Sequence, residues 1–260
     1  MRCKQIISSF ILLALLLSLA ACGKQVGGYH TIDAGLEDRV LSIGCREGDP
    51  LMDILIAALQ VRTADGTVAQ LSQSWFGRDV TQLKGDANAL AGLELPEPRV
   101  LIVGYEPGSL PFSGTNADGK AEGFEIELAQ SVCELLGWEM RTLAIDPVNA
   151  ATELASGNVD CVWGGAGLAG YTGLRAMTYI QTEYVLISRA DNPVKRVSAL
   201  EGKAMSYPPF AGAAAAGAGL LDKPDTAAKL ADTAACLTAL DAGRCDAVLT
   251  DALTAAYYQN

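Results

Sequence analysis

The side chains with the most distinctive chemistry in this sequence are its cysteines and its single histidine, His30. Five of the seven cysteines lie beyond Cys3 and Cys22, namely Cys45, Cys133, Cys161, Cys236 and Cys245. An odd number leaves at least one thiol free unless it pairs between chains, and the pattern does not predict which cysteines pair. None has the Cys-x-x-Cys spacing of a zinc site. The sequence therefore argues against a metal site and against catalysis by a histidine base, and we expect no cofactor.

Cys22 follows an apolar N-terminal segment. Arg2 and Lys4 give the segment a positive start, an apolar run covers residues 6–21, and the end reads Leu19-Ala20-Ala21-Cys22. These are the parts of a secretory signal peptide. The cysteine makes residues 1–22 resemble a bacterial lipoprotein signal, in which the cysteine receives a diacylglycerol. The run is shorter than the roughly 20 apolar residues of a membrane-spanning helix, so we expect an exported protein tethered to the extracytoplasmic face of the cell membrane by lipid.

The charge balance excludes one class of partner. The chain has 30 acidic and 19 basic residues, and its formal net charge is −11 at pH 7. A chain this acidic is poorly suited to bind nucleic acid or an anionic bilayer through charge. We interpret the charge as a property that keeps the protein soluble.

The elements that would position a site alternate between strand and helix. The apolar run from Val100 to Gly104 predicts a buried strand, and the apolar stripe from Gly123 to Gly137 predicts a helix that stops at glycine. Further strands are expected at 140–145, 159–163, 184–188, 204–207 and 246–250, with helices near 150–155, 213–221 and 232–242. This order implies two similar α/β lobes with mainly parallel sheets, which bind ligands beyond the carboxyl ends of their strands.

Five motifs between residues 100 and 251 resemble, in the right order, the family-3 extracellular solute-binding proteins, which are the polar-amino-acid receptors of ABC importers. The motifs are Pro111-Phe112 with Asp118-Gly119-Lys120, the run Gly123–Ala129, the run Gly157–Trp163, Leu200-Glu201-Gly202-Lys203, and the run Ala242–Asp251. The resemblance implies a periplasmic-binding-protein type II fold, whose two lobes close on a ligand.

The segment before residue 100 is out of order relative to this family. Residues 41–51, 64–67 and 75–77 resemble the family's end, where a strand returns through the hinge and helices complete lobe 1. We therefore expect a circular permutation, with lobe 1 from residues 43–81 and 98–190 and lobe 2 from 28–42 and 191–260. Residues 82–97 would link the ancestral termini. The alternative is a truncated receptor with an unrelated N-terminal extension.

The resemblance also implies a ligand site. A receptor that buries an amino acid must pair its carboxylate and its ammonium, because an unpaired buried charge costs several kcal/mol. Asp251 stands where the family has its ammonium-binding aspartate, and Arg175 resembles the arginine that clamps the carboxylate. Other interpretations stay open, since Asp251 could instead cap a following helix and Arg175 could be a surface residue.

Five further residues complete the candidate site. Gly165 stands where the family commonly has a hydroxyl residue, and Gly212-Ala213-Ala214 stands where it has a Gly-Ser/Thr pair, so backbone N–H groups at a helix N-terminus would bind the carboxylate there. Phe112 and Trp163 could line the pocket or belong to the core. Glu106, after the first strand, could meet a cationic group of the ligand or be solvated.

These inferences favour a monomeric, non-enzymatic receptor that captures a small polar ligand, an amino acid, for an ABC permease and its ATPase. Two other classes stay open. One is a dehydratase-like enzyme on the same fold that uses Glu106 as its carboxylate. The other is a binding module with a different ligand, because hydroxyl donors are replaced by glycine and alanine.

Overall fold

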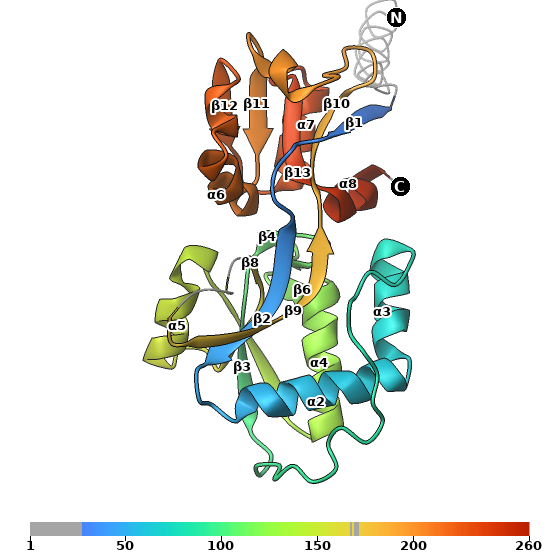
Figure 1. The fold of residues 1–260 in the computed structure, drawn as a ribbon, viewed down its shortest axis with the longest axis vertical. Helices are drawn as coiled ribbons and strands as arrows, with labels where there is room; N and C mark the ends of the chain where they lie inside the picture. The colour runs from blue at the N-terminus through green and yellow to red at the C-terminus, as the bar shows by residue number, and fades with distance from the viewer. Residues whose placement is uncertain (1–27, 167, 169–171, 260) are drawn as a thin grey trace, which may run out of the picture.

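Two segments of chain cross between two lobes in the computed structural model, which describes residues 28–166, 168 and 172–259 (Figure 1). Each lobe contains a five-stranded sheet flanked by helices. One crossing is residues 34–38, between β1 (Tyr29–Asp33) and β2 (Arg39–Arg46). The other is Glu183, between β9 (Leu174–Thr182) and β10 (Tyr184–Arg189). The lipoprotein signal predicted at residues 1–22 lies outside the described residues.

Lobe 1 has a sheet in the order β7-β3-β8-β2-β9. Its other strands are β3 (Val100–Tyr105), β7 (Glu139–Ala144) and β8 (Cys161–Ala166), which are parallel, whereas β2 is antiparallel to β8 and β9. The helices are α2 (Leu51–Ala64), α3 (Thr67–Phe76), α4 (Phe124–Leu136), α5 (Ala150–Ser156) and the 3-10 turn η1 (Pro147–Asn149). A small sheet joins β4 (Gly108–Ser109), β5 (Ser113–Thr115) and β6 (Ala121–Glu122).

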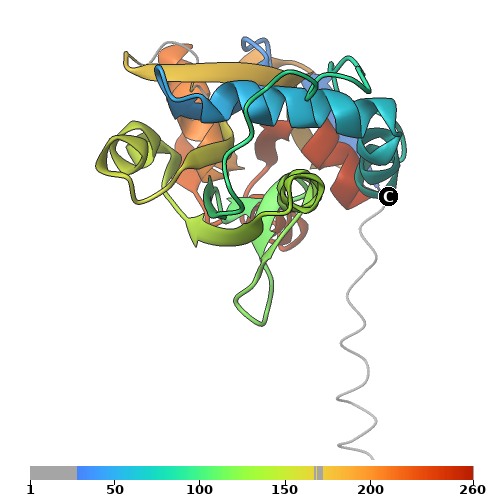
Figure 2. The same cartoon turned by 90° about the horizontal axis from the view of Figure 1, so that it is seen from below.

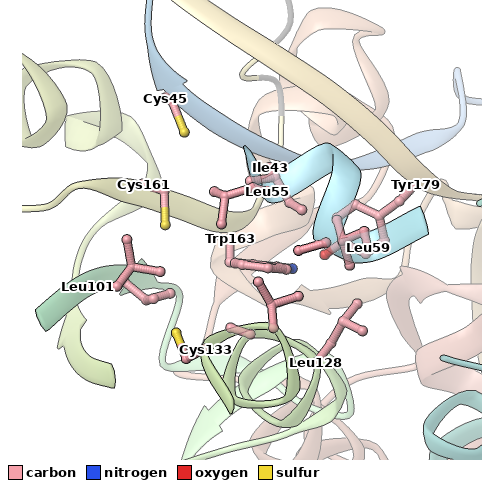
Figure 3. Close-up of a cluster of buried hydrophobic side chains, with 14 of the residues drawn as sticks. Ile43, Cys45, Leu55, Leu59, Leu101, Leu128, Cys133, Cys161, Trp163 and Tyr179 are labelled. Atoms are coloured by element: carbon pink, nitrogen blue, oxygen red, sulfur yellow. The ribbon is translucent and has the colours of Figure 1, made fainter. Parts of the chain in front are cut away.

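Alternating side chains along these strands divide the interior of lobe 1 into two cores, because successive residues point to opposite faces. Leu41, Ile43 and Cys45 of β2 face the larger core, which α2 and α4 cover (Figure 3). Val162 of β8 faces the smaller core beneath α5. Seen from below, α2 runs beside β9, with which it is in contact (Figure 2).

Helix α4 follows the sequence prediction closely. It begins after Gly123 and ends before Gly137, whose φ of 68° is left-handed and whose N–H donates to the Cys133 carbonyl. Such a glycine satisfies carbonyls that the helix end leaves unpaired. Phe124 and Leu128 on its apolar stripe are fully buried.

Lobe 2 has a sheet in the order β1-β10-β13-β11-β12. The strands β11 (Ala204–Tyr207), β12 (Thr226–Lys229) and β13 (Ala247–Asp251) are parallel, and β10 is antiparallel to β13 and β1. The helices are α6 (Pro209–Gly217), α7 (Thr233–Asp241), α8 (Ala252–Gln259) and the 3-10 turns η2 (Val197–Leu200) and η3 (Leu220–Asp222). Among the helices of the described ranges, none is both long and apolar enough to cross a membrane.

Two expected lobe boundaries are corrected. Residues 184–189, expected in lobe 1, form β10 in the sheet of lobe 2, where Leu186 pairs with Leu249. Residues 39–42, expected in lobe 2, belong to β2 in the sheet of lobe 1, where Leu41 pairs with Ile180. The ladder hydrogen bonds decide these memberships, and they pair residues far apart in sequence. Residues 82–97 contain no helix or strand, and the Asp86 N–H donates to the Gln60 carbonyl of α2.

Candidate functional site

A buried arginine lies at the centre of the contact between the lobes. Arg39 is the first residue of β2, and its side chain is fully buried. Its Nη1 donates to Asp251 Oδ2 of lobe 2 at 2.8 Å, and its Nη2 donates to Ser109 Oγ of lobe 1 at 2.6 Å. Hydrogen bonds between ionised groups are stronger than neutral ones. The Arg39 side chain therefore bridges the two lobes.

Two phenyl rings flank the same guanidinium. Its Cζ lies 3.7 Å from the ring centroid of Phe210 in lobe 2 and 5.1 Å from that of Phe112 in lobe 1. A guanidinium over an aromatic face is attracted by the ring quadrupole, and the attraction grows when water is excluded. Phe112 also packs in the lobe 1 core against Phe76, as the core interpretation predicts.

Asp251 serves two structural purposes at once. It ends β13 and is fully buried. Its Oδ1 accepts from the Thr254 N–H at 2.9 Å and its Oδ2 accepts from Thr254 Oγ1 at 2.7 Å, which is how an aspartate caps a helix. The capping interpretation is correct, and the cation that Asp251 meets in this structure is Arg39.

Glu106 is a buried carboxylate with spare hydrogen-bonding capacity. Its side chain is 4% exposed, and its Oε2 lies 3.8 Å from Arg39 Nη2, beyond hydrogen-bond distance. Neither carboxylate oxygen has a hydrogen-bond partner among the described residues, and neither does Arg39 Nε. Burial raises the pKa of Glu106, against the lowering effect of Arg39, and Asp146 raises it further. Buried polar atoms without partners are costly, so two acceptors and one donor here remain available to a ligand or water.

The cluster around Arg39 borders a pocket. A pocket of about 660 Å³ lies between residues 35–40 of the crossing segment and α6. Arg39, Phe210, Glu37 and Asp38 are among its lining residues. Elsewhere the lobes touch closely, since a Cβ on Gly108 would lie 2.7 Å from the Ala231 carbonyl oxygen.

The structure places Arg175 away from the cluster, contrary to its expected role as the carboxylate clamp. It lies near the start of β9, is 45% exposed and forms an ion pair with Asp53 of α2 at 2.7 Å. Thr182, at the other end of β9, is the strand partner of Arg39. A strand rises about 3.3 Å per residue, so Arg175 lies on the order of 20 Å from that end. It is a surface residue of lobe 1.

Trp163 belongs to the core rather than to the pocket. It is fully buried among residues that include Leu55, Leu101 and Leu128 (Figure 3). Gly165 lies in β8 and pairs with Ser42 of β2.

Gly212 lies in the first half of α6, where a Cβ would meet the Tyr207 ring at 3.2 Å. The five cysteines of the described region are buried free thiols, namely Cys45, Cys133, Cys161, Cys236 and Cys245.

Arg39, the central residue of the cluster, was not predicted from the sequence. It stands in Glu37-Asp38-Arg39, a charged run that is typical of a solvated turn. Its ion-pair partner Asp251 is 212 positions away. The expected return of a strand through the hinge near residue 41 was the one signal that could have placed Arg39 near the end of β13.

Part of the chain is similar to a known protein family. Residues 101–194 match the family of bacterial extracellular solute-binding proteins, family 3. The fold is similar to that of an ABC uptake transporter substrate-binding protein from Streptococcus pneumoniae with bound histidine, at 24% identity and a TM-score of 0.52, covering 61% of this chain and 68% of that chain. The chain matches no curated protein sequence.

Two ancestral proteins have the same fold. One is an ancestral arginine-binding protein bound to arginine, at 22% identity and a TM-score of 0.50, covering 64% of this chain and 74% of that chain. The other is an ancestral amino-acid-binding protein described as a precursor of cyclohexadienyl dehydratase, at 22% identity and a TM-score of 0.50, covering 61% and 73%.

The chain therefore has the periplasmic-binding-protein type II fold, as predicted. Residues 101–194, less than half of the chain, are the part that is similar to family 3 of the bacterial extracellular solute-binding proteins.

Proposed function

We propose that this protein is an exported receptor that captures a small solute with a cationic group between its lobes and delivers it to an ABC permease. The observation that carries the proposal is Glu106, a buried carboxylate beside the interlobe ion pair whose two oxygens lack hydrogen-bond donors among the described residues. A buried carboxylate of this kind is stabilised by a cation that donates hydrogen bonds to it. The lipid on Cys22 would hold the receptor at the membrane.

An amino acid fits the chemistry of the cluster. Its ammonium would donate to Glu106, and its carboxylate would accept from the unpartnered Arg39 Nε. The start of α6 adds little to this, because Pro208 and Pro209 have no N–H and the Ala211 N–H donates to the Pro208 carbonyl. The solved structures that support this proposal hold histidine and arginine.

A thermal-shift screen against the amino acids, followed by calorimetric titration, tests the proposal. A ligand at 100 times its Kd should add about 2.7 kcal/mol of stability. Glu106→Gln should weaken binding by at least about tenfold, because charge-assisted hydrogen bonds become neutral ones. Glu127→Gln, an exposed neighbour on α4, is the matched control and should bind normally. If no amino acid stabilises the protein, or if Glu106→Gln binds as well as the control, the proposal is wrong.

We also propose that the chain is a circular permutant of its family. β2 lies inside the lobe 1 sheet, and α2 and α3 pack on α4, so residues 39–76 are part of lobe 1 rather than a separate extension. The Gln259 amide donates to Thr31 Oγ1 at 3.3 Å, which puts the end of α8 beside β1.

A rearranged chain tests the permutation. Residues 260 and 28 are joined by a short glycine-serine linker and the chain is opened within residues 82–97. This chain should fold with an unchanged circular dichroism spectrum and bind the same solutes, because the new ends lie in a segment without helix or strand. Failure to fold under conditions where the original chain folds would contradict the proposal.

A further inference from the structure

The group at the centre of the interlobe contact is supplied by the chain itself. The Arg39 guanidinium is held by one carboxylate, one hydroxyl and two phenyl rings, drawn from both lobes. This is the set of contacts by which a protein recognises a cationic ligand. We propose that Arg39 is a built-in occupant of the cationic subsite, so that the lobes close on Arg39 without solute and an incoming cation must displace it. The inference rests on the cleft being the solute site of the proposed function, and it differs from that function in that Arg39 leaves the site instead of binding the ligand's carboxylate.

The fit of Arg39 in this position is incomplete, which favours displacement over a permanent structural role. Its Nε has no acceptor among the described residues, and its Nη2 lies 3.8 Å from Glu106 Oε2. A structural buried ion pair stabilises a protein only when its remaining hydrogen-bonding groups are satisfied. Here a solute could satisfy groups that Arg39 leaves unmatched.

A displaced Arg39 side chain could enter a neighbouring pocket. It is preceded by residues 34–38, which form no helix or strand, and it borders the pocket of about 660 Å³ beside α6. Glu37 and Asp38 line that pocket, so a displaced guanidinium would find carboxylates there as well as solvent. Displacement therefore does not leave the arginine buried without a partner.

The charges of the cluster then set the class of solute. When Arg39 leaves, Asp251 and Glu106 remain as two buried carboxylates facing the vacated space. Thr254 still donates to Asp251, but two buried carboxylates without a cation are unfavourable. Only a solute that brings a guanidinium or an ammonium compensates for the loss, and neutral or anionic solutes are rejected.

The decisive experiment removes the Arg39 side chain and supplies its guanidinium group as a free cation in solution. Arg39→Ala should gain a saturable rise in Tm of about 3 °C with methylguanidinium chloride at millimolar concentration, whereas the wild type shows none beyond sodium chloride of equal ionic strength. Arg39→Ala combined with Asp251→Asn should lose the response. If Arg39→Ala does not fold alone, methylguanidinium present during refolding should recover it. An equal response of wild type and Arg39→Ala, or no response and no recovery, overturns the inference.

Two further measurements separate this inference from the proposed function. Small-angle scattering of the solute-free wild type should give the radius of gyration of the closed lobes. A larger radius of gyration that decreases when solute is added would overturn the inference. The inference is also overturned if the wild type binds an amino acid and Arg39→Ala does not. In that case the proposed function stands, with Arg39 as the residue that binds the ligand's carboxylate. If the wild type binds no amino acid and Arg39→Ala accepts methylguanidinium, the proposed amino-acid ligand is refuted, and Arg39 still stands as the occupant of the cationic subsite.

Discussion

Ionisation of Glu125 should make the stability of this fold depend on pH. Glu125 lies in the first turn of α4 and is fully buried. The Tyr179 hydroxyl donates to its Oε1, and its Oε2 has no hydrogen-bond partner among the described residues. Burial raises the pKa of Glu125 from 4.5 to about 7, outweighing the lowering effects of Tyr179, Arg39 and Ser113.

The sign and size follow from the linkage of proton binding to folding. Between pH 4.5 and 7 the folded state keeps a proton on Glu125 that the unfolded state has released, so stability falls as pH rises. The contribution is complete below pH 4.5 and is lost as pH rises through about 7. At about 1.4 kcal/mol per pH unit, the difference between the two pKa values amounts to ~3 kcal/mol.

Urea unfolding of the wild type and of Glu125→Gln at several pH values between 4.5 and 8 measures this effect. The amide imitates the protonated carboxyl but does not titrate. The free energy of unfolding of Glu125→Gln therefore lacks the pH-dependent contribution of this side chain. The wild type minus the variant should therefore fall by ~3 kcal/mol across this range. The exposed Glu127→Gln on the same helix should give a difference that is flat with pH. A flat difference for Glu125→Gln as well would refute the reasoning.

Three other changes have distinct expected outcomes. Arg175→Ala should leave both the unfolding midpoint and solute binding unchanged in denaturation and calorimetry, because its ion pair is exposed. Cys22→Ser, expressed in the host, should move the protein from the membrane fraction to the soluble fraction, and unchanged membrane retention would contradict lipidation. Gly164→Ala should cost more than the ~1–3 kcal/mol of backbone strain alone, because its Cβ would collide with the Glu125 carboxylate. Gly157→Ala, with a similar φ of 77° and no neighbour within 4 Å, should show the strain alone.

The sequence predicts helices well where the periodicity of apolar residues agrees with the glycines at the ends of the segment. Helix α4 combines an apolar stripe with Gly123 and Gly137 at its ends, and its predicted bounds are confirmed to within one residue. Helix α6 was expected near 213–221 because of its alanines but spans Pro209–Gly217. The proline at the start of that helix was the better guide, since its fixed φ and missing N–H suit the first turn.

Strand β9 was not predicted, and the reason is physical. Its nine residues mix buried and exposed positions without strict alternation, and the strand contains Arg175, Ala176 and Met177, which have no strong strand preference. It is defined by antiparallel pairing with β2, more than 100 residues away. Long-range pairing of this kind leaves little local signal. The position of Arg175 could be predicted only with the knowledge that it lies near the start of a nine-residue strand.

The position of Arg39 explains how one ion pair can govern the arrangement of the lobes. A buried ion pair contributes little net stability, yet removing one partner costs about 3–5 kcal/mol. Arg39 directly follows one crossing segment, and Asp251 pairs with Tyr184, the residue after the other crossing. A rotation that separates these two charges leaves each of them buried without its partner. The pair therefore penalises every lobe arrangement that leaves it broken, and only a cation that replaces Arg39 at Asp251 removes that penalty.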